Sequence, residues 1–425
     1  MRNNKLKIIN KWLNGKNTNI ERKSIIWNMI SSIEYSIQSA ILLMVITRIL
    51  GLETAGVFTI AYAVTQMMAT IGSYAMRSFQ VSDTKEEYGF NTYYTSRLVS
   101  TGAMIVICFG YSIIQGYGGI KLVLVGILCA YRAMEGIEDV IHGEIQRKRR
   151  LDVASKIIAV RIFLATLLFA ILLLFTKNIV YASLGLSLGG IIISFVLNYS
   201  VIYDGSYENI SFKIESKNVL KLLMVCLPIC VGGFLYNYLG NAPKYAIDRN
   251  LSDELQTIFN VLFILIFTIN MLSSFIFKPM VLRMGELWND NKKKEFVKLI
   301  VRQLLIIVGL TVTIVVAGEI IGLDLLEWIY AVNLEKYRKL FTFLLLFGGL
   351  SAMSAYLNVV LTIMRKQIYI IIAYIGGFVA DLILLDKLTV SLKLEGAGLG
   401  YGISMFVVVM VMSCVIISNL FKNKK

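Results

Sequence analysis

Four polar residues with helical spacing lie in one otherwise apolar stretch of the chain: Arg132, Glu135, Asp139 and His142. Their spacing of i, i+3, i+7 and i+10 places all four along one face of a helix, because an α-helix has about 3.6 residues per turn. A guanidinium on that face could bind a phosphate or sugar hydroxyls. The alternative is that Arg132 and Glu135 form a structural ion pair that joins two helices.

Three further cations, Arg48, Lys244 and Arg249, follow long apolar segments. The planar fork of arginine can bind two oxygens of a phosphate or diphosphate at once, and Lys244 lies just before Arg249. We therefore predict that Arg48, Arg132, Lys244 and Arg249 bind substrate in a cavity. The alternative is that these side chains lie at the lipid headgroups and pair with nearby carboxylates.

Three carboxylates, Glu34, Asp139 and Asp381, lie within apolar segments. A carboxylate removed from water can carry a proton or bind a sodium ion. These residues are therefore candidates for coupling to an ion gradient. Pairing with an arginine from another segment is the alternative.

Motifs for catalysis and for metal binding are absent from the sequence. There is no glycine-rich phosphate loop with its lysine, no paired-cysteine metal knuckle and no nucleophile elbow. Cys226 and Cys230 are one helical turn apart, but His142 is the only histidine, so we predict no metal site. The longest hydrophilic stretches, 77–95 and 203–218, are too short to fold as domains. We predict no enzymatic activity and no cofactor.

The elements that carry these residues are long apolar segments. Of the 425 residues 57% are hydrophobic and only 16% are charged, against about 45–50% and about 25% in soluble domains. Spanning a bilayer takes about 20 mainly apolar residues. The sequence predicts twelve such spans, at 25–46, 54–76, 96–117, 121–141, 157–176, 179–202, 219–239, 255–277, 299–318, 340–363, 368–388 and 396–419.

The distribution of positive charge predicts the orientation of these spans. With the N-terminus inside, 29 of the 42 Lys and Arg residues lie in or beside cytoplasmic segments, and 10 lie in or beside external ones. Cytoplasmic segments of membrane proteins carry an excess of Lys and Arg. Both termini are therefore expected in the cytoplasm. A basic inner face against anionic lipid accounts for the net charge of +15 without nucleic acid.

The spans divide into two halves at the hydrophilic stretch 203–218. We predict a basic cytoplasmic segment at 1–24, a six-helix lobe at 25–202, a cytoplasmic linker at 203–218, a second six-helix lobe at 219–419 and a cytoplasmic tail at 420–425. A gapless shift of 201 residues lays 48–77 over 249–278 and places Arg48 on Arg249. Two parallel six-helix lobes with a substrate site between them are a known transporter plan.

Four short motifs resemble those of a transporter family. Thr47–Phe58 resembles the junction between the first two spans of bacterial polysaccharide flippases, and Met76–Gln80, Asn241–Arg249 and Arg283–Trp288 are similar to segments of the same proteins. The resemblance is to the Wzx-type branch of the multidrug/oligosaccharidyl-lipid/polysaccharide exporter superfamily, and it covers nearly the whole chain.

This resemblance implies a polytopic all-α protein with about twelve transmembrane helices in two lobes that form a V. It also implies a cargo of undecaprenyl-diphosphate-linked sugar units, moved across the bacterial cytoplasmic (inner) membrane for the assembly of capsule, O-antigen or lipopolysaccharide. The expected partners are the lipid-linked oligosaccharide, membrane lipids, a polysaccharide polymerase and glycosyltransferases. Alternatives are a multidrug or cation antiporter, a peptidoglycan-precursor flippase and a membrane-bound polymerase; the last would need a large external loop, which the sequence lacks.

Overall fold

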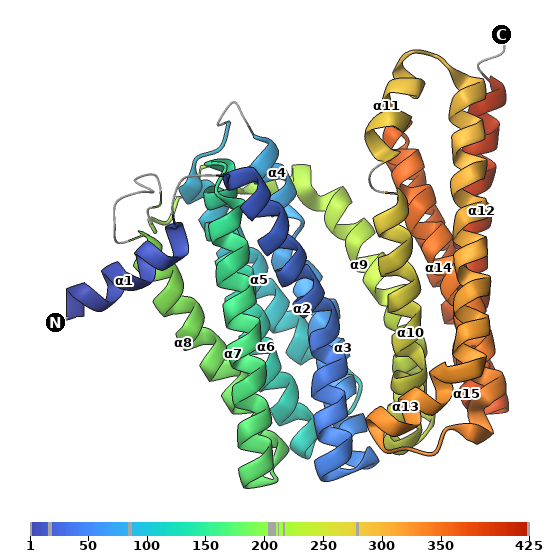
Figure 1. Cartoon of the computed structure of the whole chain (residues 1–425), viewed down its shortest axis with the longest axis horizontal. Coiled ribbons are helices and arrows are strands. Elements are labelled where there is room, and N and C mark those ends of the chain that lie inside the picture. Colours follow the sequence, from blue (N-terminus) through green and yellow to red (C-terminus); the bar gives the residue numbers. More distant parts are fainter. Residues whose placement is uncertain are drawn as a thin grey trace. The chain divides into compact units, whose positions relative to one another are not determined.

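The computed structural model describes residues 2–15, 19–83, 87–202, 210, 212–215, 217–277 and 280–422. Within these ranges the regular elements are all helices, and no strand occurs (Figure 1). The chain divides into two compact units, unit 1 (Met1–Phe234) and unit 2 (Leu235–Lys425), and the division falls within helix α9 (Val219–Asn250). The linker predicted at 203–218 and the tail predicted at 420–425 lie partly outside the described residues, and the domain boundaries stay a prediction.

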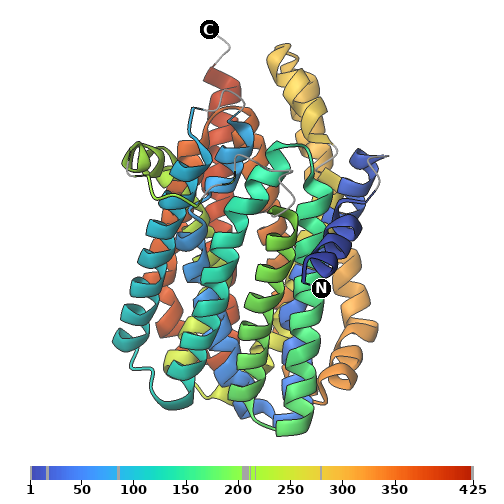
Figure 2. The ribbon, with the colours of Figure 1, turned by 90° about the vertical axis from the view of Figure 1, so that its left-hand side faces the viewer.

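Unit 1 is a bundle of long helices that run side by side (Figure 2). In order along the chain these are α1 (Arg2–Asn14), α2 (Ile20–Leu50), α3 (Leu52–Ser73), α4 (Met76–Ser82), α5 (Phe90–Ile114), α6 (Gly119–Arg147), α7 (Leu151–Thr176) and α8 (Ile179–Ile202). The most extensive packing is of α7 against α2 and α8, and of α3 against α5 and α6. The short helix α1 lies within the predicted N-terminal segment and packs against α7 and α8.

Two local features of unit 1 position the polar residues described below. Tyr74 and Ala75 have positive φ angles of 48° and 52°, so α3 ends there and α4 starts in a new direction. On α8, a Cβ added at Gly190 would lie 2.5 Å from a ring carbon of Tyr131. Glycine is therefore required for α8 to approach α6 this closely.

The described part of unit 2 contains the remainder of α9 and six further α-helical elements: α10 (Asp253–Phe277), α11 (Val281–Asn289), α12 (Lys293–Ala317), α13 (Leu323–Tyr330), α14 (Arg338–Ile363) and α15 (Gln367–Lys422). A π-helical turn (Gly318–Gly322) joins α12 to α13, and a short 3-10 helix (Glu335–Tyr337) precedes α14. Helix α14 packs against α10, α12 and α15. The 56 residues of α15 are two helices joined at Lys393, whose φ of 53° and ψ of −130° are not helical. The carbonyl oxygen of Leu388 would lie 1.9 Å from a Cβ at Gly396, so the chain turns tightly there.

The number of spans agrees with the sequence prediction. Ten helical segments of the described chain are long and apolar enough to cross a membrane. Two additions bring the number to twelve, since α15 consists of two helices and α6 has the length of a span although its charges exclude it from the ten. The predicted all-helical, multi-pass fold is confirmed.

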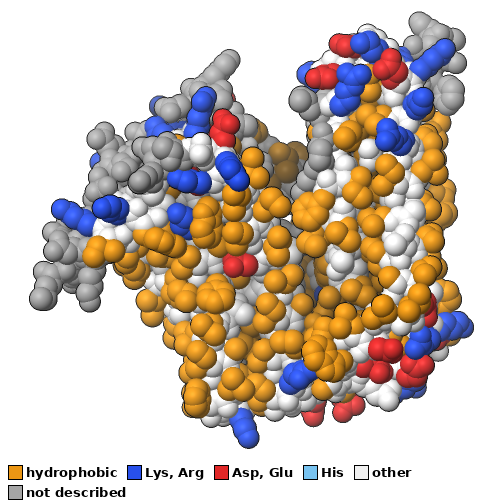
Figure 3. All heavy atoms as spheres, in the orientation of Figure 1, with side chains coloured by type: hydrophobic (Ala, Val, Ile, Leu, Met, Phe, Trp, Pro, Cys, Tyr) orange, Lys and Arg blue, Asp and Glu red, His pale blue; other side chains and the backbone are white. Residues whose placement is uncertain are grey.

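The outer surface of each unit is suited to lipid. Large apolar side chains project outward from the middle of the helices, for example Val106, Phe195 and Phe406, of which 72%, 68% and 52% is exposed. On the face shown in Figure 3, hydrophobic side chains cover the middle of each unit, while many of the Lys, Arg, Asp and Glu side chains gather toward its ends. Exposing such an apolar surface to water is unfavourable, whereas contact with the hydrocarbon of a bilayer is not.

Candidate functional site

A buried cluster of ion pairs joins α6 to α7 in unit 1. Arg132 Nη1 lies 2.6 Å from Glu135 Oε2, and Glu135 Oε1 lies 3.0 Å from Arg161 Nη1. Arg161 Nε lies 2.9 Å from Glu138 Oε2. The side chains of Arg132, Arg161 and Glu138 are almost wholly buried. We call these four residues the α6–α7 cluster; its two guanidinium groups and two carboxylates balance in charge.

Uncharged groups surround the α6–α7 cluster. Asn198 on α8 donates a hydrogen bond of 3.1 Å from Nδ2 to Glu138 Oε1, and its Oδ1 lies 3.1 Å from His142 Nε2. The guanidinium of Arg132 lies over the ring of Tyr62 at 4.7 Å, a cation–π contact. Its Nη2 is buried and has no hydrogen-bond partner among the described residues. The cluster is thus packed into the bundle, with one nitrogen of Arg132 left unused.

A second cluster, which we call the Arg77 triad, joins α4, α5 and α6. Asp139 pairs with two arginines at once: Oδ1 lies 2.9 Å from Arg77 Nη1, and Oδ2 lies 2.8 Å from Arg97 Nη2. Arg97 has no exposed side-chain surface and also donates to the carbonyl oxygen of Gly72. One carboxylate therefore serves two guanidinium groups, and the triad carries one positive charge in excess.

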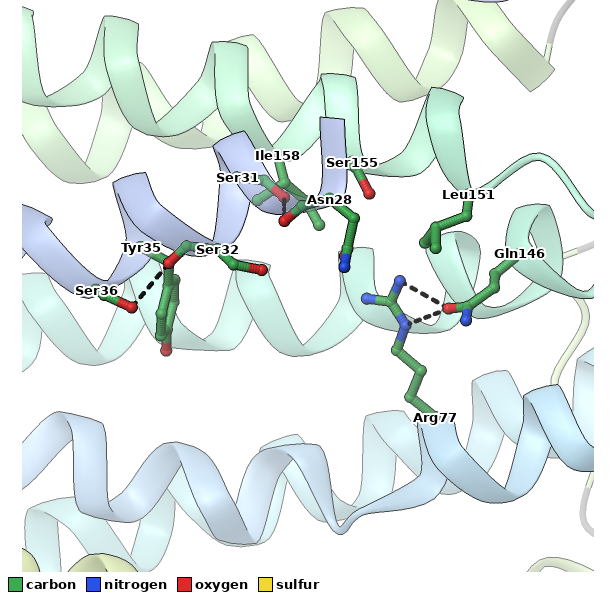
Figure 4. Close-up of a pocket in the computed structure, with 10 residues that line it drawn as sticks. All are labelled: Asn28, Ser31, Ser32, Tyr35, Ser36, Arg77, Gln146, Leu151, Ser155 and Ile158. Carbon is green, nitrogen blue, oxygen red and sulfur yellow. Dashed lines mark hydrogen bonds between the residues drawn. The ribbon is translucent and has the colours of Figure 1, made fainter. Parts of the chain in front are cut away.

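Beside the Arg77 triad lies a cavity of about 510 Å³ within unit 1. Its lining residues come from α2, α4, α6 and α7, and eight of the ten carry a polar group: Asn28, Ser31, Ser32, Tyr35, Ser36, Arg77, Gln146 and Ser155, beside Leu151 and Ile158. Arg77 extends from α4 toward Gln146 and Asn28 (Figure 4). Gln146 Oε1 accepts hydrogen bonds from Arg77 Nε at 3.2 Å and Nη2 at 3.1 Å.

The predicted polar stripe of α6 divides between two sides of the helix. Glu135 contacts Arg161 of α7 and His142 contacts Asn198 of α8, while Arg132 lies over Tyr62 of α3. Asp139 instead contacts the arginines of α4 and α5. The alternative that Arg132 and Glu135 form a structural ion pair fits this geometry. No ligand contact of Arg132 is needed to explain its burial, and its role in binding stays a prediction.

The two remaining candidate carboxylates lie apart from these clusters. Glu34 on α2 is partly buried, and its Oε2 has no hydrogen-bond partner in the described part of the chain. Asp381 in the first part of α15 is 3% exposed and accepts a hydrogen bond of 2.5 Å from Ser404 in the second part, while its Oδ2 has no partner within the described ranges. Each therefore keeps a carboxylate oxygen that a proton or a cation could occupy.

The three predicted cations outside α6 have different surroundings. Arg48 is exposed in the last turn of α2. In unit 2, Arg249 Nη2 lies 2.8 Å from Asp386 Oδ1 on α15 and 3.0 Å from its Oδ2. Lys244 lies over the rings of Phe263 and Phe267 at 5.4 and 5.6 Å. Lys244 and Arg249 thus both contact other helices of unit 2, and neither is shown to bind a ligand.

Sequence reasoning did not select Arg77, Arg97 or Arg161 as site residues, although they hold the carboxylates of α6. Arg161 lies inside the predicted span 157–176, and a charge at mid-bilayer costs about 2.5–3.5 kcal/mol on insertion scales. That cost was a signal that Arg161 has a partner in another helix. Arg77 and Arg97 carried a weaker signal, because both lie at the ends of predicted spans, where arginine is common.

Comparison with known proteins shows which solved structures have a similar fold. No protein-family model matches the chain. The capsular polysaccharide biosynthesis protein CapF of Staphylococcus aureus is 22% identical over 320 residues, which are 74% of this chain and 78% of that protein.

Three solved structures are similar over almost the whole chain. The lipid II flippase MurJ has a TM-score of 0.73 at 11% identity, covering 94% of this chain and 89% of its own. A MATE-family multidrug resistance transporter of the MOP superfamily has a TM-score of 0.67 at 13% identity, with 92% and 96% covered. A MOP-superfamily transporter from Pyrococcus furiosus has a TM-score of 0.58 at 14% identity, with 98% of each covered. The chain is a multi-pass membrane protein with the all-helical fold of MATE-type transporters.

Proposed function

We propose that this protein moves undecaprenyl-diphosphate-linked oligosaccharide units from the inner to the outer leaflet of the bacterial cytoplasmic membrane. The observation that carries the proposal is the excess positive charge of the Arg77 triad, in which Asp139 pairs with both Arg77 and Arg97. A cationic drug would be repelled by such a site, whereas a diphosphate would neutralise it. The fold and the capsule-related relative are consistent with a cargo of this kind.

Arginine side chains can supply the positive charge and the hydrogen bonds that a diphosphate needs when it leaves water. The charged headgroup must leave water, and unpaired charge is costly in a medium of low dielectric constant. Guanidinium groups within the spans replace the lost hydration with charge-assisted hydrogen bonds. In the family that the sequence resembles, transport proceeds by alternating access, and we extend that mechanism to this chain.

Coupling to an ion gradient is part of the proposal. Among the three candidates, Asp139 has both carboxylate oxygens in contact with guanidinium groups, which leaves neither oxygen for a coupling ion. Glu34 and Asp381 each keep one buried carboxylate oxygen that has no partner among the residues the structure describes. We assign the coupling role to one or both of these residues.

The proposed setting follows from the charge distribution and from the cargo. Both termini are in the cytoplasm, glycosyltransferases supply the lipid-linked unit, and a polymerase receives it. Peptidoglycan precursor is the alternative cargo that the lipid II flippase suggests.

A gene deletion tests the function. Cells without the protein should accumulate an undecaprenyl-linked saccharide on the inner leaflet and should lose surface polysaccharide. Purified protein in vesicles should expose a labelled lipid-diphosphate-oligosaccharide on the opposite leaflet. Unchanged surface polysaccharide together with increased sensitivity to cationic drugs would instead identify a multidrug transporter.

A further inference from the structure

We propose that the cavity beside the Arg77 triad is a binding site for a diphosphate, with Arg77 as its charged ligand and the hydroxyl groups of α2 as its neutral ligands. The inference deepens the proposed function and rests on it for the identity of the natural ligand, a lipid-linked diphosphate. The existence of an anion site rests on the geometry of unit 1 alone.

The Arg77 triad has two guanidinium groups and one carboxylate, and a bound anion would balance this excess of positive charge. Arg97 is wholly buried, and Asp139 is the carboxylate it shares with Arg77. In the described part of the chain, neither arginine has an ion pair with a second carboxylate. Asp and Glu are also absent from the ten residues that line the cavity. The positive charge of Arg77 is therefore uncompensated on the side that faces the cavity.

The guanidinium of Arg77 keeps donors for a ligand. It has five N–H groups. Two hydrogen bonds run to Gln146 and one to Asp139. One N–H on each terminal nitrogen remains, and the side chain is 26% exposed. Gln146 and Asp139 hold the fork in place, which lowers the entropic cost of binding.

The opposite wall supplies neutral groups. Asn28, Ser32 and Ser36 project from α2 into the same space, and Ser155 extends from α7 (Figure 4). Ser36 donates its O–H to the carbonyl oxygen of Ser32, so its oxygen is left as an acceptor for a sugar hydroxyl. Hydroxyl and amide groups of this kind suit phosphate oxygens and sugar hydroxyls. A cavity of about 510 Å³ lies within the usual range for small-molecule sites.

The test measures binding of two probes to the purified full-length protein in lipid nanodiscs by titration calorimetry. Inorganic diphosphate and farnesyl diphosphate separate the anion from its lipid. Both probes should bind the unaltered protein, and tighter binding of the prenyl compound would assign the site to a lipid headgroup. Absence of binding for both would overturn the proposal.

Two variants assign the binding to the cavity. Arg77→Ala should weaken diphosphate binding about tenfold or more, because a charge-assisted pair is lost, and Arg77→Lys should recover part of it. Ser32→Asp, at an exposed position, should weaken binding as strongly by placing a carboxylate opposite Arg77. Ser418→Asp is the matched control, since Ser418 is also an exposed helical serine and lies in unit 2.

The outcomes separate this inference from the proposed function. Equal binding by Ser32→Asp and the unaltered protein would overturn the site, even if the protein flips lipid-linked saccharide. Arg77-dependent binding in a protein whose deletion causes no accumulation of lipid-linked saccharide would support the site and reject the function. A variant Arg77→Ala that fails to fold leaves Ser32→Asp as the deciding measurement.

Discussion

The guanidinium of Arg97, with no exposed surface, donates a hydrogen bond of 2.8 Å to the carboxylate of Asp139. This pair joins α5 to α6, and the Asp139 side chain is 24% exposed. Replacing Arg97 leaves Asp139 paired with Arg77, but it removes this charge-assisted hydrogen bond and the one to the carbonyl oxygen of Gly72. A hydrogen bond to a charged group contributes about 1.5–3 kcal/mol. Arg97→Met should therefore lower thermal stability in detergent sharply.

An exposed ion pair provides the control for Arg97. Lys221 lies 3.0 Å from Glu87, and both side chains are more than half exposed. Lys221→Met should leave thermal stability nearly unchanged, because water screens the pair. Similar losses for both variants would contradict the structural role of Arg97.

A double-mutant cycle with Glu135 can decide whether Arg132 has a structural role or binds the cargo. If Arg132 is mainly structural, Arg132→Met and Glu135→Gln should each destabilise the protein, and the double variant should be more stable than the sum of the two effects predicts. Coupling of about 0.5–3 kcal/mol is typical of residues in contact. A stable Arg132→Met protein that no longer transports would instead assign this arginine to the cargo.

Arg249 gives the clearest test of a predicted cavity cation. Its partner Asp386 is 52% exposed, so the pair contributes little to stability. Arg249→Ala should keep normal abundance in the membrane while export falls, and Arg249→Lys should recover only part, because lysine lacks the bidentate fork. Asp386→Asn leaves the arginine in place and should export normally. Equal loss in both variants would show that the ion pair itself is needed.

Asp381→Asn tests ion coupling. Asparagine has nearly the same shape and can still accept the hydrogen bond from Ser404. Transport into vesicles should continue but should lose its response to an imposed proton or sodium gradient. Ser404→Ala keeps the carboxylate and should retain that response. An unchanged response in Asp381→Asn would leave Glu34 as the candidate.

The predicted orientation can be tested with single cysteines in unit 2 at Asp290, which follows α11, and at Lys336, in the short 3-10 helix before α14. In intact cells, a membrane-impermeant thiol reagent should label Lys336→Cys and spare Asp290→Cys. Lysed cells should show labelling of both. The opposite pattern in intact cells would reverse the inner and outer assignments.

The span pattern was readable from the sequence because a soluble fold could not bury so many apolar segments of bilayer length. The charged face of α6 was also readable, since its spacing is helical. Its division between two sides was not, because the partners Arg77, Arg97 and Arg161 lie on three other helices. Sequence spacing gives the position of a residue around its own helix, but not which neighbouring helix it faces.

The predicted equivalence of Arg48 and Arg249 in the two halves of the chain illustrates the same limit. Both are arginines at the ends of long helices, as the repeat suggested. Their different surroundings, an exposed helix end for one and a bond to Asp386 for the other, depend on contacts that no local pattern encodes. The cavity of unit 1 was likewise hidden, because its serines from α2 look like ordinary residues of an apolar span.

The turn at Lys393 has a consequence for how this chain can vary among its relatives. Asp381 lies twelve residues before it and Ser404 eleven residues after it, and the hydrogen bond between them spans the two arms of this hairpin. One residue inserted in either arm would rotate the positions beyond it by about 100°. Loops elsewhere can grow or shrink freely. By contrast, the number of residues between Asp381 and Ser404 is as constrained as the identity of these two residues.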